Sequence, residues 1–382
     1  MDEQEGVGGS PIGRRLRAWR RQRGVTVSDL AGLLEIGAGE LAAVEEGSGW
    51  WDRRGRLHAA AGVLRIEAEE LTGQPYGDGP GAELAEIRGS VMRVRRVITS
   101  PPVSNPAPAF EGEEAVRGAA GEALRAAEVG DEEGVARSAG RVVAALGGAP
   151  SDGRGAELLV EGGMAVAGWL RRWGYRDLAW SVLQRARVRA GPRSVLVAEE
   201  MRVLLDGGWP GRALERAGCQ GVAVDAVTGP VAAVALAVLG RASEADEVLA
   251  AAAVAAGSVR ELAVVDVARA TAALEASRPV AALEHLARLP GVESCGAGLW
   301  WEALVVRALA EARSGDTPAA AGSLATAGRE SPLRTLGDPW ARELLSALAP
   351  RALGDDGMVL RNLAAWAGVG PQPDLAEDHH TP

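Results

Sequence analysis

The sequence predicts an all-α protein, in which an N-terminal bundle of five short helices precedes an α-solenoid built from paired helices. Three observations support this prediction. Apolar residues recur three and four positions apart through residues 12–73, as they do on one face of an α-helix. Turn residues recur at intervals of 32 to 44 residues along residues 111–368. No segment after residue 111 alternates apolar and polar residues as a half-buried strand would.

Residues 12–73 contain the five helices of the bundle. The first has Ile12, Leu16 and Trp19 on one face and ends at Gly24, and Thr26 or Ser28 then caps the second. The inward positions of the later helices are Leu30, Leu33 and Leu34, then Leu41 and Val44, then Leu57, Ala60, Ala61 and Leu64, and finally Leu71. Two helices joined by a tight turn in such a unit form a helix-turn-helix, whose second helix would enter the major groove of DNA.

At these residues the segment resembles the Xre/Cro repressor family. The resemblance covers about a sixth of the chain, and residue types and spacings agree over all five helices at Ile12, Gly13, Leu16, Arg20, Gly24, Leu30, Ala31, Leu34, Ile36, Leu41, Val44, Glu45, Gly47 and the closing "ELTG". In the family an arginine of the first helix pairs with a glutamate of the third. The resemblance therefore implies a structural ion pair between Arg20 and Glu45.

The resemblance also implies DNA contacts from the third helix, but the residues at those positions are poor at reading bases. They are Gly37, Ala38, Gly39, Glu40 and Ala43. Almost none of these side chains can make a bidentate contact to a base edge, and acidic groups repel phosphates. The basic residues Arg14, Arg15, Arg17, Arg53 and Arg54 could still hold the phosphate backbone, and residues 12–66 carry a net charge of +4.

Residues 74–110 form a predicted linker. It contains one amphipathic helix at about residues 83–99, with Leu84, Ile87, Val91 and Val94 on one face, followed by a proline-rich stretch that cannot be helical. A lone helix between two breaks is expected to pack between domains or against a second subunit, and we expect a homodimer.

Residues 111–368 read as a series of helix pairs. Taking Gly130, Gly174, Gly208, Gly240, Ser277 and Gly315 as turn positions gives spacings near those of stacked helical hairpins. This segment is similar to the tetratricopeptide repeat family, although no repeat carries the full signature. Because one helix pair cannot bury its apolar face alone, the pairs should stack into a curved solenoid with a concave side.

A cluster of aromatic and basic residues marks a candidate groove for a peptide, small-molecule or protein ligand. Residues 169–193 carry a net charge of +6. Stacking and cation–π contacts there could hold an acidic peptide, a phosphorylated small molecule or an aromatic ligand. The alternative is that the tryptophans are interhelical core and the arginines a solvated face. The groove candidates are Trp169, Arg172, Trp173, Tyr175, Arg176, Trp180, Trp300 and Trp301.

Composition excludes several classes of function. A net charge of −10 argues against nucleic-acid binding over the whole surface, and no apolar run is long enough to cross a membrane. Cys219 and Cys295 match no metal or redox spacing, and the chain contains no Walker loop, HExxH or GxSxG motif. We therefore expect a cytoplasmic protein that is not an enzyme and needs no cofactor or metal, with disordered ends at residues 1–11 and 369–382.

Two functions remain open. The first is a ligand- or peptide-responsive transcriptional regulator that binds DNA through a helix-turn-helix with a degenerate recognition helix. The alternative is an adaptor, in which the helix-turn-helix unit has lost DNA binding and mediates protein–protein interaction together with the repeats. Ala38, Gly39, Ala42 and Ala43 favour the adaptor, as do Trp50 and Trp51 after the third helix.

Overall fold

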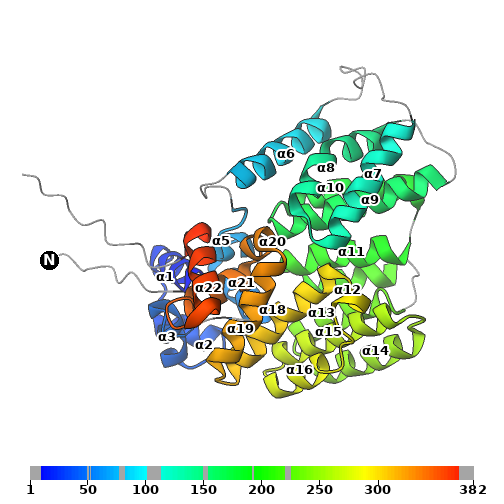
Figure 1. The fold of residues 1–382 in the computed structure, drawn as a ribbon. Coiled ribbons are helices and arrows are strands. Elements are labelled where there is room, and N and C mark those ends of the chain that lie inside the picture. Colours follow the sequence, from blue (N-terminus) through cyan, green and yellow to red (C-terminus); the bar gives the residue numbers. More distant parts are fainter. Residues whose placement is uncertain are drawn as a thin grey trace, which may run out of the picture.

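The computed structural model describes residues 10–49, 51, 53–76, 82–100, 113–148, 154–191, 193–219 and 225–369. Within these ranges the elements are α-helices joined by turns, and none of the described segments forms a strand. The predicted all-α fold class is therefore confirmed. Figure 1 shows the first helices, in blue, beside the last ones, in orange and red.

The N-terminal unit consists of five helices around one apolar core. Leu16, Leu30 and Leu41 are fully buried in it, as predicted. Leu33 differs, because its side chain is 64% exposed. Successive helix positions lie about 100° apart, and Leu33 falls beyond the edge of the stripe that Leu30 and Ala31 bury. The five helices are α1 (Pro11–Gln22), α2 (Val27–Leu33), α3 (Ala38–Glu46), α4 (Arg54–Leu64) and α5 (Ala68–Thr72).

The linker contains α6 (Ala82–Thr99), close to the predicted helix. Its apolar stripe, including Ile87 and Val94, is buried against α8 and α10 of the same chain. The proline-rich stretch and most of both predicted disordered ends lie outside the described residues. Ser10 and Val369, which the prediction placed at or beyond the ends of the ordered chain, are both buried.

The rest of the chain is the repeat domain, which contains sixteen of the described helices. They are α7 (Glu113–Val129), α8 (Glu132–Gly147), α9 (Arg154–Arg172), α10 (Arg176–Ala190), α11 (Ser194–Asp206), α12 (Pro210–Cys219), α13 (Gly229–Val238), α14 (Ala242–Ala255), α15 (Val259–Glu275), α16 (Pro279–Leu286), α17 (Val292–Cys295), α18 (Ala297–Arg313), α19 (Thr317–Glu330), α20 (Pro332–Gly337), α21 (Pro339–Leu348) and α22 (Gly354–Ala367). None of the helices in the described ranges combines the length and apolarity needed to cross a bilayer.

The predicted turn positions separate the two helices of six successive pairs: α7/α8, α9/α10, α11/α12, α13/α14, α15/α16 and α18/α19. Each turn residue has a positive φ, from 59° at Ser277 to 87° at Gly174. Glycine reaches this left-handed region without a steric penalty, which explains why five of the six positions are glycine. The pairs pack on one another in chain order, forming an α-solenoid.

The solenoid curves far enough for its beginning and end to meet. α18 of the sixth pair packs against α7 of the first. At the same junction the Ser331 hydroxyl, just before α20, donates to the Gly130 carbonyl at 3.0 Å. The helices that follow the sixth pair complete the turn, with α22 packed on α19 and α21.

The N-terminal unit sits directly on the repeat domain. Its apolar core is continuous with that of the last repeats, since Leu16 and Leu71 belong to the same buried cluster as Trp340 and Leu344. α1 packs against α21, and Figure 1 shows α1 beside the last helices of the chain. Although the N-terminal unit and the last repeats are far apart in the chain, their apolar side chains form one continuous core.

Candidate functional site

The helix-turn-helix is braced by an ion pair between α1 and α3. The Arg20 guanidinium donates to both carboxylate oxygens of Glu45, each at 2.6 Å, and both side chains are buried. Arg20 also donates to the Val25 carbonyl at 2.9 Å, at the entry to α2. Hydrogen bonding to Glu45 raises the pKa of Arg20, so its guanidinium remains ionised. The pair implied by the family resemblance is therefore present.

The first turn of α3 is the exposed face of this motif. Gly37, Ala38, Gly39 and Glu40 are exposed, and Ala43 is half-buried. Glu40 forms an ion pair with Arg56 at the start of α4. The exposed α3 surface therefore offers one paired carboxylate and several small side chains that form no base-specific hydrogen bonds.

The predicted phosphate-binding arginines fall into two groups. Arg14 is exposed and Arg17 half-buried on α1, whereas the Arg15 guanidinium donates to the Thr72 carbonyl at 3.2 Å. Arg53 donates to the Ser277 hydroxyl at 2.7 Å, and Arg54 lies 3.7 Å from the Asp206 carboxylate. Arg53 and Arg54 thus contact the repeat domain, while Arg14 and Arg17 remain on the outer surface.

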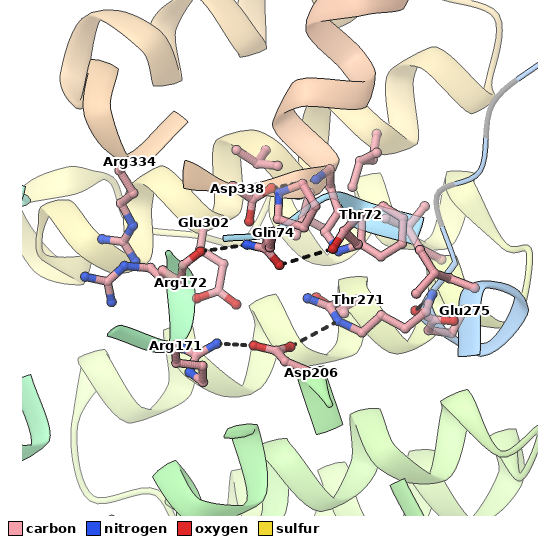
Figure 2. Close-up of a pocket in the computed structure, with 18 of the residues that line it drawn as sticks. Thr72, Gln74, Arg171, Arg172, Asp206, Thr271, Glu275, Glu302, Arg334 and Asp338 are labelled. Carbon is pink, nitrogen blue, oxygen red and sulfur yellow. Dashed lines mark hydrogen bonds and ion pairs between the residues drawn. The ribbon is translucent and has the colours of Figure 1, made fainter. Parts of the chain in front are cut away.

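A cavity of about 110 Å³ lies where the N-terminal unit meets the repeat domain. We call it the interdomain cavity. Figure 2 shows its lining, with Arg172 and Arg334 at one end and Glu275 at the other. From the N-terminal side it is lined by Arg54, Leu57, His58, Thr72 and Gln74. From the repeat domain it is lined by Arg171, Arg172, Arg176, Asp206, Thr271, Leu274, Glu275, Trp301, Glu302, Val305, Val306, Leu309, Arg334, Asp338, Pro339 and Trp340.

Gln74 joins the two units at this cavity. Its side-chain amide donates to the carbonyls of Arg172 at 2.9 Å and Gly337 at 3.2 Å, and its oxygen accepts from Arg176 at 2.9 Å. The residue lies two positions after the end of α5 and is buried. One side chain of the N-terminal unit therefore bonds to α9, α10 and α20 at once.

Most cations of the cavity already have a carboxylate partner. Arg171 binds Glu199 at 2.9 Å and also binds Asp206. Arg172 donates to Glu132 at 2.9 Å, and Arg176 pairs with Glu69. Opposite charges this close hold the pKa of Asp206 below its ordinary value despite burial, which acts in the other direction.

Arg334 is different, because it pairs with none of the described carboxylates. Its guanidinium lies over the Trp301 indole, 4.7 Å from the ring centroid. Burial, reinforced by repulsion from Arg172, lowers the pKa of Arg334 to about 10. The side chain is still cationic at neutral pH, and the Glu132 and Glu302 carboxylates act on it through their charges without forming an ion pair.

Several buried nitrogens around the cavity lack hydrogen-bond partners. They are Nδ1 of His58 and the Nε atoms of Arg172, Arg176 and Arg334. Burial lowers the pKa of His58 to about 4, so its ring is neutral at neutral pH. A buried polar group without a hydrogen-bond partner destabilises the folded protein. A ligand or water molecule that supplies the partner removes this cost.

The predicted groove residues do not form one surface. Arg172, Arg176 and Trp301 line the interdomain cavity. Trp169 and Trp173 are buried core, and Nε1 of Trp173 donates to Glu132 at 3.0 Å. Trp180 and Trp300 are half-buried beneath Arg216 and Arg307, and half-buried Tyr175 packs against the same apolar cluster as Trp173.

The sequence prediction missed the cavity residues outside the aromatic cluster. Gln74, Asp206 and Arg334 are separated by more than a hundred residues from one another, and no local motif connects them. Across the described residues, no three His, Cys, Asp or Glu side chains are grouped so that they could hold a metal ion.

The fold and the cavity define an all-helical protein in which a helix-turn-helix bundle is seated on a tetratricopeptide-like solenoid. No protein-family model matches the chain, and no curated protein matches it. Among solved structures, the crystal structure of Bacillus thuringiensis PlcR in complex with the peptide PapR7 and DNA is similar, with 13% identity over 84% of this chain and 94% of that chain. The TM-score of 0.26 is too low to establish a shared fold.

Proposed function

We propose that the chain is a ligand-responsive transcriptional regulator, in which α1–α5 contact DNA and the repeat domain receives the signal. The observation that carries this proposal is the composition of the interdomain cavity, which both units line. A ligand that contacts both units has different affinities for different arrangements of them. Its binding therefore shifts the population towards one arrangement, which is the physical requirement for coupling two sites.

DNA binding would rest mainly on phosphate contacts. Arg14, Arg21 and Arg23 are exposed on or just after α1, and Arg17 is half-buried beside them. The exposed turn of α3 can do little base reading, since Glu40 is its only side chain with hydrogen-bonding groups. The proposed regulator thus binds with a strong salt dependence and modest sequence preference.

A homodimer is part of the same proposal, because helix-turn-helix proteins commonly place two recognition helices on successive half-sites. The apolar stripe of α6 is covered within its own chain, so a dimer needs another surface. The mass of the protein in solution, measured by sedimentation or light scattering, tests this expectation.

The adaptor remains the second candidate, and the surface of α2 and α3 favours it. Leu33 is 64% exposed beside the small residues Ala38 and Gly39, which together resemble a protein-contact surface more than a DNA-reading one. Trp51 does not contribute, because it is 1% exposed and belongs to the core. Trp50 lies outside the described residues.

A salt titration of DNA binding separates the two functions. At about 50 mM salt, where phosphate contacts are strongest, the regulator should shift DNA from upstream of its own gene. The double variant Arg14→Ala, Arg17→Ala should bind more weakly, and its salt slope should fall by about 0.9 for each phosphate that the variant no longer neutralises. Arg351→Ala, at an exposed position after α21, is the control. Absence of any shift at that salt concentration would exclude the regulator and leave the adaptor.

A further inference from the structure

Arg334 is held in place although it has no carboxylate partner. Below it, Nε1 of Trp301 donates to the Thr335 hydroxyl at 3.0 Å, which fixes the plane of the indole. Thr335 in turn donates to the Ser331 carbonyl at 2.9 Å and is fully buried. The guanidinium therefore rests on a rigid aromatic surface in a defined orientation, as a preorganised anion-binding group does.

A second cation lies close to Arg334. Arg172 is near enough for its charge to lower the pKa of Arg334, and its Nη2 is occupied by Glu132 while its Nε has no partner. Glu302 also lines the cavity, and its carboxylate is exposed. It forms no hydrogen bond or ion pair with the described residues. Two neighbouring guanidiniums with unpartnered nitrogens attract an acceptor that carries negative charge.

Part of the cavity wall is apolar. It consists of side chains from α4, α15 and α18, namely Leu57, Leu274, Val305, Val306 and Leu309. A ligand that satisfies the arginines must therefore also bury an apolar body against these side chains. An inorganic anion would leave this wall in contact with water.

The size of the cavity limits the occupant further. Its volume is about 110 Å³. For comparison, a cavity of roughly 150 Å³ holds one benzene ring, and pockets for drug-sized ligands begin near 300 Å³. The enclosed space therefore holds one aliphatic group smaller than a benzene ring, and the remainder of a larger ligand extends through the open side of the cavity.

We propose that the interdomain cavity binds a small carboxylate with an apolar body, and that Arg334 on its Trp301 platform is the principal contact of the carboxylate. The carboxylate belongs either to a free short-chain acid or to the C-terminal residue of a peptide. This inference rests on the proposed function, since it names the ligand of that site. Glu132 already occupies one side of Arg172, so Arg334 is the cation that remains without an ion-pair partner for the ligand to bind.

Calorimetry on the full chain, without DNA, tests the ligand class. The probes are 4-methylpentanoate and its neutral isostere 4-methylpentanamide. The acid should bind, and the amide should bind about 10-fold or more weakly, because charge-assisted hydrogen bonds are roughly twice as strong as neutral ones. Similar affinity for the two probes, or no binding of the acid at about 10 mM, where even a millimolar ligand saturates, would overturn the proposal.

Variants then test the assigned residue. Arg334→Gln should weaken binding of the acid by about 10- to 100-fold and affect the amide much less, because the variant removes the positive charge and the guanidinium donors that favour an anion. Arg212→Gln, at an exposed position on α12, is the matched control and should bind like the parent protein. A purely structural Arg334 would instead alter both probes equally. Unchanged binding of the acid to Arg334→Gln would refute its assignment.

The source of the carboxylate is settled by a third comparison. The tripeptide Ala-Ala-Leu with a free C-terminus and the same tripeptide with an amidated C-terminus carry the same apolar end. Tighter binding of the free tripeptide than of 4-methylpentanoate identifies a peptide, and the reverse order identifies a small acid. These measurements involve no DNA. A negative result would therefore overturn the proposed ligand, and it would not affect the DNA-binding test of the proposed function.

Discussion

The Glu275 carboxylate on α15 accepts a hydrogen bond from the backbone N–H of Arg54, the first residue of α4, at 2.8 Å. Its second oxygen accepts from the N–H of Gly55 at 3.2 Å. The N-cap residue of α4, Arg53, makes no capping hydrogen bond of its own. A helix of the N-terminal unit is therefore capped by an acidic residue of the repeat domain, which satisfies free N–H groups and complements the helix dipole.

Glu275→Gln tests the strength of this contact. The amide keeps the shape of the side chain but loses its charge, so we expect the free energy of unfolding to fall by about 1 to 2 kcal/mol. Urea denaturation measures the change. Glu330→Gln, on an exposed position of α19, should alter stability by less than about 0.5 kcal/mol and serves as the control. Equal effects of the two substitutions would show that the cap contributes nothing specific.

A second acidic residue, Glu343 on α21, holds the start of α1. It accepts from the Ser10 hydroxyl and from the Ile12 N–H, and it is 1% exposed. Burial raises the pKa of Glu343 to about 7, although those hydrogen bonds act to lower it. The folded state therefore retains a proton that the unfolded chain releases above its ordinary value of 4.5.

This shift predicts how stability depends on pH. The contribution of Glu343 is fully present below about pH 4.5 and is lost as the pH rises through about 7, where the buried group ionises. At about 1.36 kcal/mol for each pKa unit, the shift from 4.5 to about 7 corresponds to a loss of about 3 kcal/mol. Chemical denaturation between pH 5 and 8 measures the unfolding free energies of the parent protein and of Glu343→Gln. The difference between the two isolates the contribution of Glu343, because the titrations of the other groups cancel. A difference that stays constant over this range would contradict the prediction.

Gly174 permits a close approach between the units. A Cβ added there would lie 2.5 Å from the Cβ of Gln74, in addition to the strain of a φ of +87°. We expect Gly174→Ala to destabilise the protein and to increase cleavage of the chain near Gln74 by a protease. Gly315→Ala is a matched control, because φ is +84° and a Cβ would meet nothing within 4 Å. Gly315→Ala should lose only the free energy of placing alanine at a positive φ, about 1 kcal/mol. Equal losses of stability in the two variants would exclude a steric clash at Gly174.

The Arg20 and Glu45 pair yields a further prediction. Arg20→Ala leaves the Glu45 carboxylate buried without its partner, so we expect a loss of about 3 to 5 kcal/mol in unfolding free energy. Replacing both residues, as Arg20→Met with Glu45→Leu, should recover most of that loss, since no charge stays buried. Thermal and urea denaturation measure both. Arg21→Ala, at an exposed neighbouring position, is the control.

Local pattern predicted much of the fold. The i, i+3, i+4 spacing located α1 to α6, and the six turn positions coincide with residues of positive φ. The candidate site was predicted less well. Only Arg172, Arg176 and Trp301 of the predicted groove line the cavity, because aromatic and basic composition cannot distinguish a core tryptophan such as Trp169 from a cavity wall.

The sequence alone determined which segments are helical and where each helix pair turns, because periodicity and glycine conformation act over a few residues. It also indicated the Arg20 and Glu45 brace. Only the tertiary structure decided where the N-terminal unit sits and which charge remains unpaired. The Ser10 and Glu343 contact spans 333 positions, and the neighbours of Arg334 come from distant helices. An apolar stripe shows that a face is buried, whereas the partner that buries it depends on the path of the whole chain.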